Sequence, residues 1–177
     1  GLAPYVSEMA RALVYDMYQE TAYSAGLRVY TTIHSRDQQL ANDAVRNGVL
    51  AYTLRADYPG PEANLSLDAD PEKANEQIRQ TIIKHQDIQG MLVAVVLKAS
   101  KKAVTVTRGD GEVIKITGKG LEPIEATFAR NAEDRIKLRA GSVVRIVELV
   151  EGWSLIQKPE VQAAFVATNT HDGSIRA

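Results

Sequence analysis

Side chains that commonly perform catalysis or bind metals are few and scattered in this 177-residue chain. Its three histidines, at positions 34, 85 and 171, are remote from one another in the sequence. None has a second histidine three or four residues away, the spacing with which one helix face presents two metal ligands. Cysteine is absent, which excludes thiol catalysis, thiolate metal sites, iron–sulfur clusters and disulfide bonds. We therefore interpret the histidines as structural residues and predict no metal site.

Motifs for nucleophilic catalysis and phosphate binding are also missing. No serine stands in G-x-S-x-G, and none is followed by a lysine three residues later. The glycine-rich stretches at 109–111 and 118–120 fit neither a P-loop nor a dinucleotide-binding motif, so we interpret them as turns. The paired carboxylates Glu133 and Asp134 are followed by basic residues, which is typical of a solvated surface. The sequence thus predicts no catalytic residue and no cofactor.

The composition indicates two structural units. With 45% apolar residues the chain can bury a core, and its net charge of −1 excludes a strongly basic nucleic-acid-binding protein. Residues 91–158 hold 12 basic and 8 acidic side chains, a charge of +4, whereas the rest of the chain carries −5. All seven tyrosines precede residue 59. The longest apolar run, at 91–97, is far shorter than the roughly 20 residues that span a bilayer.

Hydrophobic spacing predicts the elements of the N-terminal part. A proline suited to the first helical position and apolar residues at every third or fourth position predict a helix over 4–17. Alternating β-branched and aromatic residues predict a short strand at 27–33. A capping-box sequence starts a second predicted helix over 35–54, and an Asp-Pro pair starts a third over 70–85.

From residue 91 onward the pattern becomes that of strands. The first of these is apolar throughout, which predicts a strand buried on both faces. The next two alternate, and the glycines at 108–111 between them suit a tight hairpin turn. Five short strands predict a small antiparallel barrel of the OB type, so the fold class is α+β. The strands are predicted at 91–97, 101–107, 112–117, 143–150 and 153–157, with a last one at 162–168.

Six stretches carry a resemblance to a known family. They are APYVSEM at 3–9, GLRVYTTI at 26–33, YPGPEA at 58–63, GWSL at 152–155, PEVQAAFVA at 159–167 and DGSIRA at 172–177. Taken in this order, they resemble the class A penicillin-binding proteins of the 1A type along nearly the whole chain. Only about 118–140 is unlike the family.

The resemblance implies an excised fragment of a bifunctional enzyme that polymerises and cross-links peptidoglycan. Such a parent is periplasmic and held in the inner membrane by an N-terminal anchor outside this sequence. Its glycosyltransferase and transpeptidase domains carry the catalytic residues, and none of these falls within this chain. The resemblance divides the chain into a linker helix, strand and helix on the transpeptidase side (1–57), a loop and connecting helix (58–87), an inserted OB-like domain (88–158) and the truncated first strand of the transpeptidase domain (159–177).

The implied function is that of a non-catalytic spacer and protein-interaction module in cell-wall synthesis. The expected partners are the rest of the parent chain and envelope regulatory proteins bound by the inserted domain. The local charge of +4 suits an acidic partner, and the candidate contacts around the hairpin are Lys101, Lys102, Arg108 and Lys115. In the absence of a transpeptidase body, the apolar faces of 4–17 and 27–33 are expected to self-associate or to be loosely held.

Two other functions compete with this one. An OB domain can bind single-stranded nucleic acid, which needs aromatic stacking platforms and a basic groove, but the predicted strands offer only Trp153. A hydrolase that uses scattered carboxylates would need a convergent motif, and the sequence contains none. The sequence therefore favours the interaction module.

Overall fold

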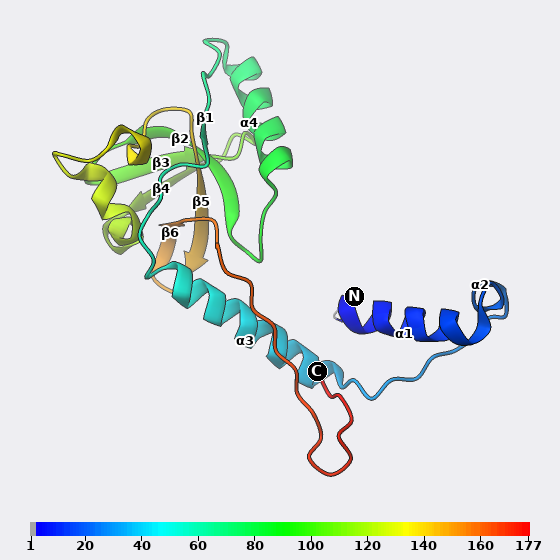
Figure 1. The fold of residues 1–177 in the computed structure, drawn as a ribbon. Coiled ribbons are helices and arrows are strands. Elements are labelled where there is room, and N and C mark those ends of the chain that lie inside the picture. The colour runs from blue at the N-terminus through cyan, green and yellow to red at the C-terminus, as the bar shows by residue number, and fades with distance from the viewer. Residues whose placement is uncertain (1–2) are drawn as a thin grey trace. The chain divides into compact units, whose positions relative to one another are not determined.

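The computed structural model describes residues 3–177, which divide into two compact units (Figure 1). The first unit combines residues 3–48 with residues 162–177, and the second comprises residues 49–161. One helix, α3 (Ser35–Thr53), begins in the first unit and ends in the second. The unit boundaries differ from the window at 91–158 that the composition singles out.

The first unit is built from helices and extended segments. Its helices are α1 (Pro4–Tyr18), the short α2 (Thr21–Ser24) and the N-terminal part of α3. Proline stands in the first turn of α1, where its missing N–H leaves no hydrogen bond unmade. No residue of α1 is buried, so this helix contributes no side chain to a buried core.

The extended segments of the first unit pair only at isolated points, so the strands predicted at 27–33 and 162–168 are not formed. The hydroxyl of Thr32 donates a 2.6 Å hydrogen bond to the carbonyl oxygen of Ile175. In the C-terminal segment a single bridge joins Thr168 to Ile175. Alternating β-branched residues favour an extended backbone, but a strand also needs a continuous neighbour, and the sequence pattern does not show whether one exists.

The second unit is an antiparallel sheet of six strands with one helix and two 3-10 segments. The strand order is β1-β5-β2-β3-β4, and β6 pairs with the edge of β5 that also holds β1. The elements are β1 (Ala63–Asn64), α4 (Pro71–His85), β2 (Leu92–Ala99), β3 (Ala103–Thr107), β4 (Val113–Thr117), η1 (Gly118–Phe128), η2 (Asp134–Ile136), β5 (Ser142–Leu149) and β6 (Gly152–Ile156).

The α+β class is confirmed, and the five predicted strands correspond to β2 to β6. The predicted barrel is not closed, because β4 does not pair with β6 and η1 packs against both strands instead. The additional strand β1 is only two residues long and shows no alternating pattern. It lies against β5 because Gly141 adopts a φ of 88° and has no side chain, which lets the carbonyl group of Leu65 approach closely.

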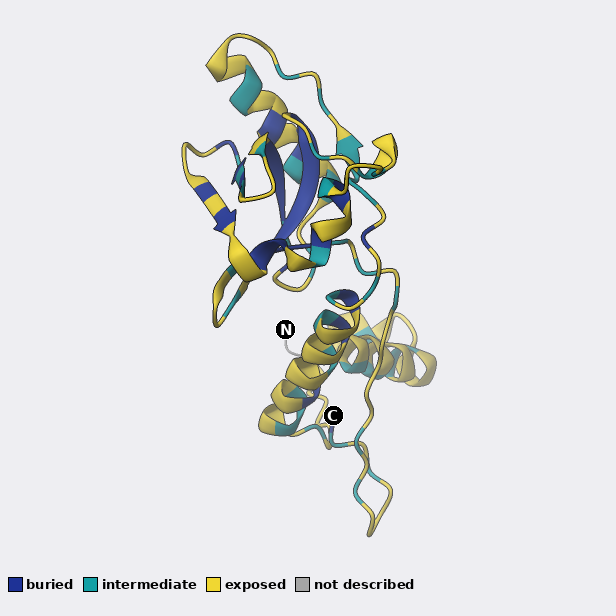
Figure 2. Cartoon of the chain, turned by 90° about the vertical axis from the view of Figure 1, so that its left-hand side faces the viewer, coloured by how far each residue is buried: buried dark blue, intermediate teal, exposed yellow. Residues whose placement is uncertain are grey.

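The sheet has two apolar faces. On the inner face, Val96 belongs to a core that also contains Ile124 of η1. On the outer face, Val95 packs against Ile78 of α4. The predicted burial of the 91–97 strand on both faces is therefore confirmed for residues 93–96, and Figure 2 shows the buried residues of this unit concentrated in its strands.

Helix α4 covers only part of the outer face. The predicted Asp-Pro start is confirmed: the carboxylate of Asp70 accepts hydrogen bonds from the backbone N–H groups of Glu72 and Lys73 at 2.9 and 3.4 Å. From there the helix packs against the first half of β2 and the start of β5. The outer face of the second half of β2 and of the adjoining parts of β3 and β4 carries exposed or half-buried residues. We call this region the open face.

Candidate interaction surfaces

A buried arginine joins the end of α4 to the sheet. Arg145 of β5 has a fully buried side chain, and its Nε lies 2.5 Å from a carboxylate oxygen of Glu62. Its two terminal nitrogens donate hydrogen bonds to the carbonyl oxygens of His85 and Gln86 at 3.2 and 3.0 Å. The second carboxylate oxygen of Glu62 lies 2.9 Å from Nδ1 of His85. The cluster gives His85 a structural role, as the sequence analysis expects.

A second ion pair lies beside this cluster. Arg108, which follows β3, forms hydrogen bonds of 3.0 and 2.9 Å to the two carboxylate oxygens of Asp87. Arg108 also donates a 2.9 Å hydrogen bond to the carbonyl oxygen of Val93, and Asp87 accepts one from the Val93 N–H at 2.8 Å. From α4, Arg79 reaches the carbonyl oxygen of Gly109 at 2.7 Å. These bonds attach the middle of α4 to the hairpin and the segment after its C-terminal end to the sheet.

The charges in these clusters lower the pKa of both carboxyl groups. Burial alone would raise the pKa of Glu62, but hydrogen bonds and charge from Arg145 and His85 bring it below its usual value. Burial likewise opposes ionisation of Asp87, and the hydrogen bonds from Arg108 and the Val93 N–H outweigh it, so the pKa of Asp87 is also lowered. Both groups are therefore carboxylates at neutral pH.

We expect the second unit to lose stability in acid. A carboxyl group whose pKa is lower in the folded state stabilises the fold above its unfolded pKa, and this contribution disappears as the pH falls through the folded pKa. For Glu62 and Asp87 the loss begins near their ordinary values of 4.5 and 3.8 and continues below them. Urea titrations between pH 7 and pH 3, followed by the fluorescence of the single tryptophan, Trp153, will measure it.

The variant that carries both Glu62→Gln and Asp87→Asn is the control for this titration. It should be less stable than the wild type at pH 7 and should show a flatter dependence on pH below 5. A wild-type urea midpoint that stays constant from pH 5 to pH 3 would contradict the role assigned to these carboxylates.

The structure separates the four basic residues that the sequence grouped as partner contacts. Lys101 and Lys102 are exposed in the turn between β2 and β3, and Lys115 is exposed in the middle of β4. Arg108 follows the opposite end of β3, about 20 Å from the lysine turn at the usual rise per strand residue. Its guanidinium group is held by Asp87, so Arg108 contributes to the attachment of α4.

The open face has one further lysine, which the sequence pattern does not indicate. Lys98 is exposed and lies directly opposite Thr105 of β3, which in turn lies opposite Lys115 of β4. Residues directly opposite each other in a sheet point to the same face, so these three residues form one row across three strands. A β-bulge between Val96 and Lys98 shifts the register and produces this arrangement. Nothing in the local sequence indicates that bulge.

The first unit exposes large apolar side chains. Met9, Leu13 and Met17 of α1 have exposed fractions of 56, 58 and 73%, and the following segment exposes Val29 and Tyr30. Figure 2 shows most of this unit in the colour of exposed residues. An apolar surface of this extent is unusual for a free monomer and typical of a surface that another protein part covers.

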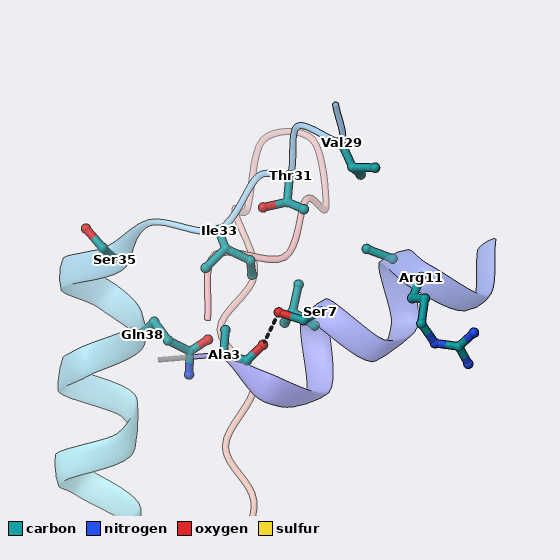
Figure 3. A pocket seen from close by; sticks show the side chains of 10 residues that line it. Ala3, Ser7, Arg11, Val29, Thr31, Ile33, Ser35 and Gln38 are labelled. Atoms are coloured by element: carbon teal, nitrogen blue, oxygen red, sulfur yellow. Dashed lines mark hydrogen bonds between the residues drawn. The ribbon is translucent and has the colours of Figure 1, made fainter. Parts of the chain in front are cut away.

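The same unit contains a groove of about 560 Å³ between α1, the extended segment and the start of α3 (Figure 3). Val6, Ala10 and Ile33 contribute apolar lining, while Ser7 hydrogen-bonds to the carbonyl oxygen of Ala3 within its own helix. The side chain of Arg11 extends away from the groove. The lining offers no cluster of acid–base groups, so its chemistry suits packing rather than catalysis.

Residues 3–177 contain neither a candidate metal site nor a candidate membrane-spanning helix. No three side chains of the His, Asp and Glu types are grouped so that they could hold a metal ion. None of the helices in this part of the chain is long and apolar enough to cross a membrane.

The second unit is thus an open antiparallel OB-like sheet with a helix attached to its outer face, and it is joined to a unit with an exposed apolar surface. The family described as "Penicillin-binding protein OB-like domain" has a model that matches residues 58–161. The chain belongs to this family of penicillin-binding protein OB-like domains, which confirms the resemblance found in the sequence.

Similar proteins extend the likeness to nearly the whole chain. Penicillin-binding protein 1A of Escherichia coli K12 is 33% identical over 99% of this chain, and that of Neisseria lactamica is 32% identical over the same share. The crystal structure of penicillin-binding protein 1A from Haemophilus influenzae matches 97% of the chain and 25% of its own length, with a TM-score of 0.75 and 26% identity. The chain spans 21 and 22% of the two curated relatives, about a fifth of their length.

Proposed function

We propose that this chain is a non-catalytic region of a bifunctional peptidoglycan synthase that serves as a spacer and a protein-interaction module. The observation that carries the proposal is the family match over 58–161, together with relatives that share almost the whole chain. A penicillin-binding protein 1A as parent would place the chain in the periplasm and anchor the parent in the inner membrane. The parent's glycosyltransferase and transpeptidase activities would reside in other domains.

The first unit supports a connecting role within a longer protein. Its exposed apolar side chains on α1 and at 27–30 require cover, and a transpeptidase body in the same chain would supply it. In this proposal residues 1–57 and 159–177 belong to the transpeptidase side, and the second unit carries the inserted domain. Self-association of the separate chain through the same surface stays a prediction.

The nucleic-acid-binding alternative finds no support in the comparisons. Single-stranded nucleic acids bind OB domains by stacking bases on exposed aromatic rings. The row across β2, β3 and β4 consists of Lys98, Thr105 and Lys115, and it carries no ring. A protein partner suits this surface better.

A penicillin-labelling experiment tests whether the chain lacks transpeptidase chemistry. We expect the purified chain to acquire no label from a fluorescent penicillin, because acylation needs an activated serine and no serine here has a lysine three residues later. The penicillin-binding protein 1A of Escherichia coli, treated in parallel, is the positive control. A fluorescent band that survives denaturation of the chain studied would overturn the assignment.

A further inference from the structure

We propose that the open face, with the lysine turn beside it, is the docking surface for an acidic segment of a protein partner. The inference rests on the proposed function as an interaction module, and it identifies where that interaction takes place and what chemistry it uses. The charged residues are Lys98, Lys101, Lys102 and Lys115.

The position of these lysines is determined by the strand register. Val96 lies opposite Val106 on the inner face, and a regular strand would return Lys98 to that same face two residues later. The β-bulge prevents this and places Lys98 opposite Thr105, outside the core. Lys98 and Lys115 are then two strand spacings apart, about 10 Å. The bulge adds a second charge to the face.

The charge of the surface is not neutralised within the chain. None of the four lysines forms an ion pair among the described residues, whereas Lys119 and Lys137 each have an acidic partner. Arg108, at the far end of β3, is neutralised by Asp87. A cluster of unpaired positive charges attracts a negatively charged partner and repels a positively charged one. The surface is therefore complementary to carboxylates.

The side chains of the open face favour a protein segment over other anions. Thr105, Ala103 and Thr117 separate the lysines and leave room for an extended backbone. In an extended segment, side chains on one face repeat at about 6.7 Å, so every second residue can present a carboxylate to the lysines. The alternative explanation is that the lysines only protect an edge strand from aggregation. The same experiment decides between the two.

The test uses the full chain and a fluorescein-labelled octapeptide of alternating Glu and Thr, with a Gln–Thr peptide as the uncharged control. Fluorescence anisotropy at low ionic strength should show binding of the Glu–Thr peptide only, and this binding should weaken as salt is added. The variant Lys98→Glu/Lys115→Glu should reduce the affinity about tenfold or more. The matched control Lys73→Glu/Lys84→Glu makes the same change of charge at exposed positions of α4 and should reduce it less than twofold.

Thermal melts must first show that both variants fold like the wild type, since their substituted residues are exposed. Equal loss of affinity in the two double variants, or no binding by the wild type, would overturn the proposal and leave the edge-protection explanation. Stronger binding to vesicles of phosphatidylglycerol and phosphatidylcholine than to the peptide, lost in Lys98→Glu/Lys115→Glu, would replace the protein partner with a lipid surface. None of these outcomes affects the penicillin-labelling result, so the two proposals can fail separately.

Discussion

Replacement of Arg145 by methionine is expected to lower the free energy of unfolding of the second unit by about 3–5 kcal/mol, the usual cost of removing one partner of a buried ion pair. The substitution leaves the half-buried carboxylate of Glu62 without its main counter-charge. It also removes the N–H groups that donate hydrogen bonds to the carbonyl oxygens of His85 and Gln86. These carbonyl groups lie at the C-terminal end of α4, where no further turn of helix can supply a donor. Urea denaturation followed by Trp153 fluorescence reports this loss, because that residue lies in β6 of the same unit.

Two further variants show whether the loss of stability in Arg145→Met comes from the burial of this ion pair or from the loss of a charge alone. Lys119→Met breaks the exposed ion pair with Glu151 and should destabilise the unit far less than Arg145→Met does, because solvent screens an exposed pair. The double variant Glu62→Met/Arg145→Met should recover part of the loss, because a buried ion pair replaced as a whole by apolar residues is often tolerated. If Arg145→Met were no more destabilising than Lys119→Met, the arginine would not hold α4 on the sheet.

The sequence predicted the elements of the second unit well because its signals are local. The Asp-Pro pair places the start of α4, and the uninterrupted apolar run of β2 follows from its burial on both faces. The turn glycines at 109 and 111 have positive φ angles of 77° and 90°, as a tight hairpin requires. Strand β1 shows no such local signal. Its pairing with β5 depends on the close approach of the carbonyl group of Leu65 to Gly141, which is distant in the sequence.

The candidate surface was predicted only in part, because charge alone does not show which side chains are free. Arg108 counted as an exposed hairpin cation, but its partner Asp87 stands 21 residues earlier in the chain. Lys98 follows an apolar run, and the sequence does not show that its side chain points away from the core. That orientation depends on the register between β2 and β3. Long-range pairing and a bulge therefore changed the set of residues, and the prediction of a basic contact surface around the hairpin stays a prediction.

The segment at 118–140 showed no regular pattern, yet it supplies part of the core. Irregular 3-10 turns have no fixed hydrophobic period, so the apolar residues of η1 could not be assigned to a face from the sequence. In the structure Leu121 and Ile124 are buried in the inner core beside Ile116 and Leu155. η1 thus occupies the space between β4 and β6, where the sheet has no hydrogen bonds.

Substitution of Ile124 by alanine should therefore destabilise the second unit by about 2–5 kcal/mol, as for other buried isoleucines. The side chain is fully buried, and the surrounding strands can collapse into the resulting cavity only in part. Ile83→Ala on α4 is the matched control, because that isoleucine is 67% exposed and should cost no more than about 0.5 kcal/mol. Both are measured by urea denaturation with Trp153 fluorescence, and an equal cost for the two variants would mean that η1 is a surface loop that contributes nothing to the core.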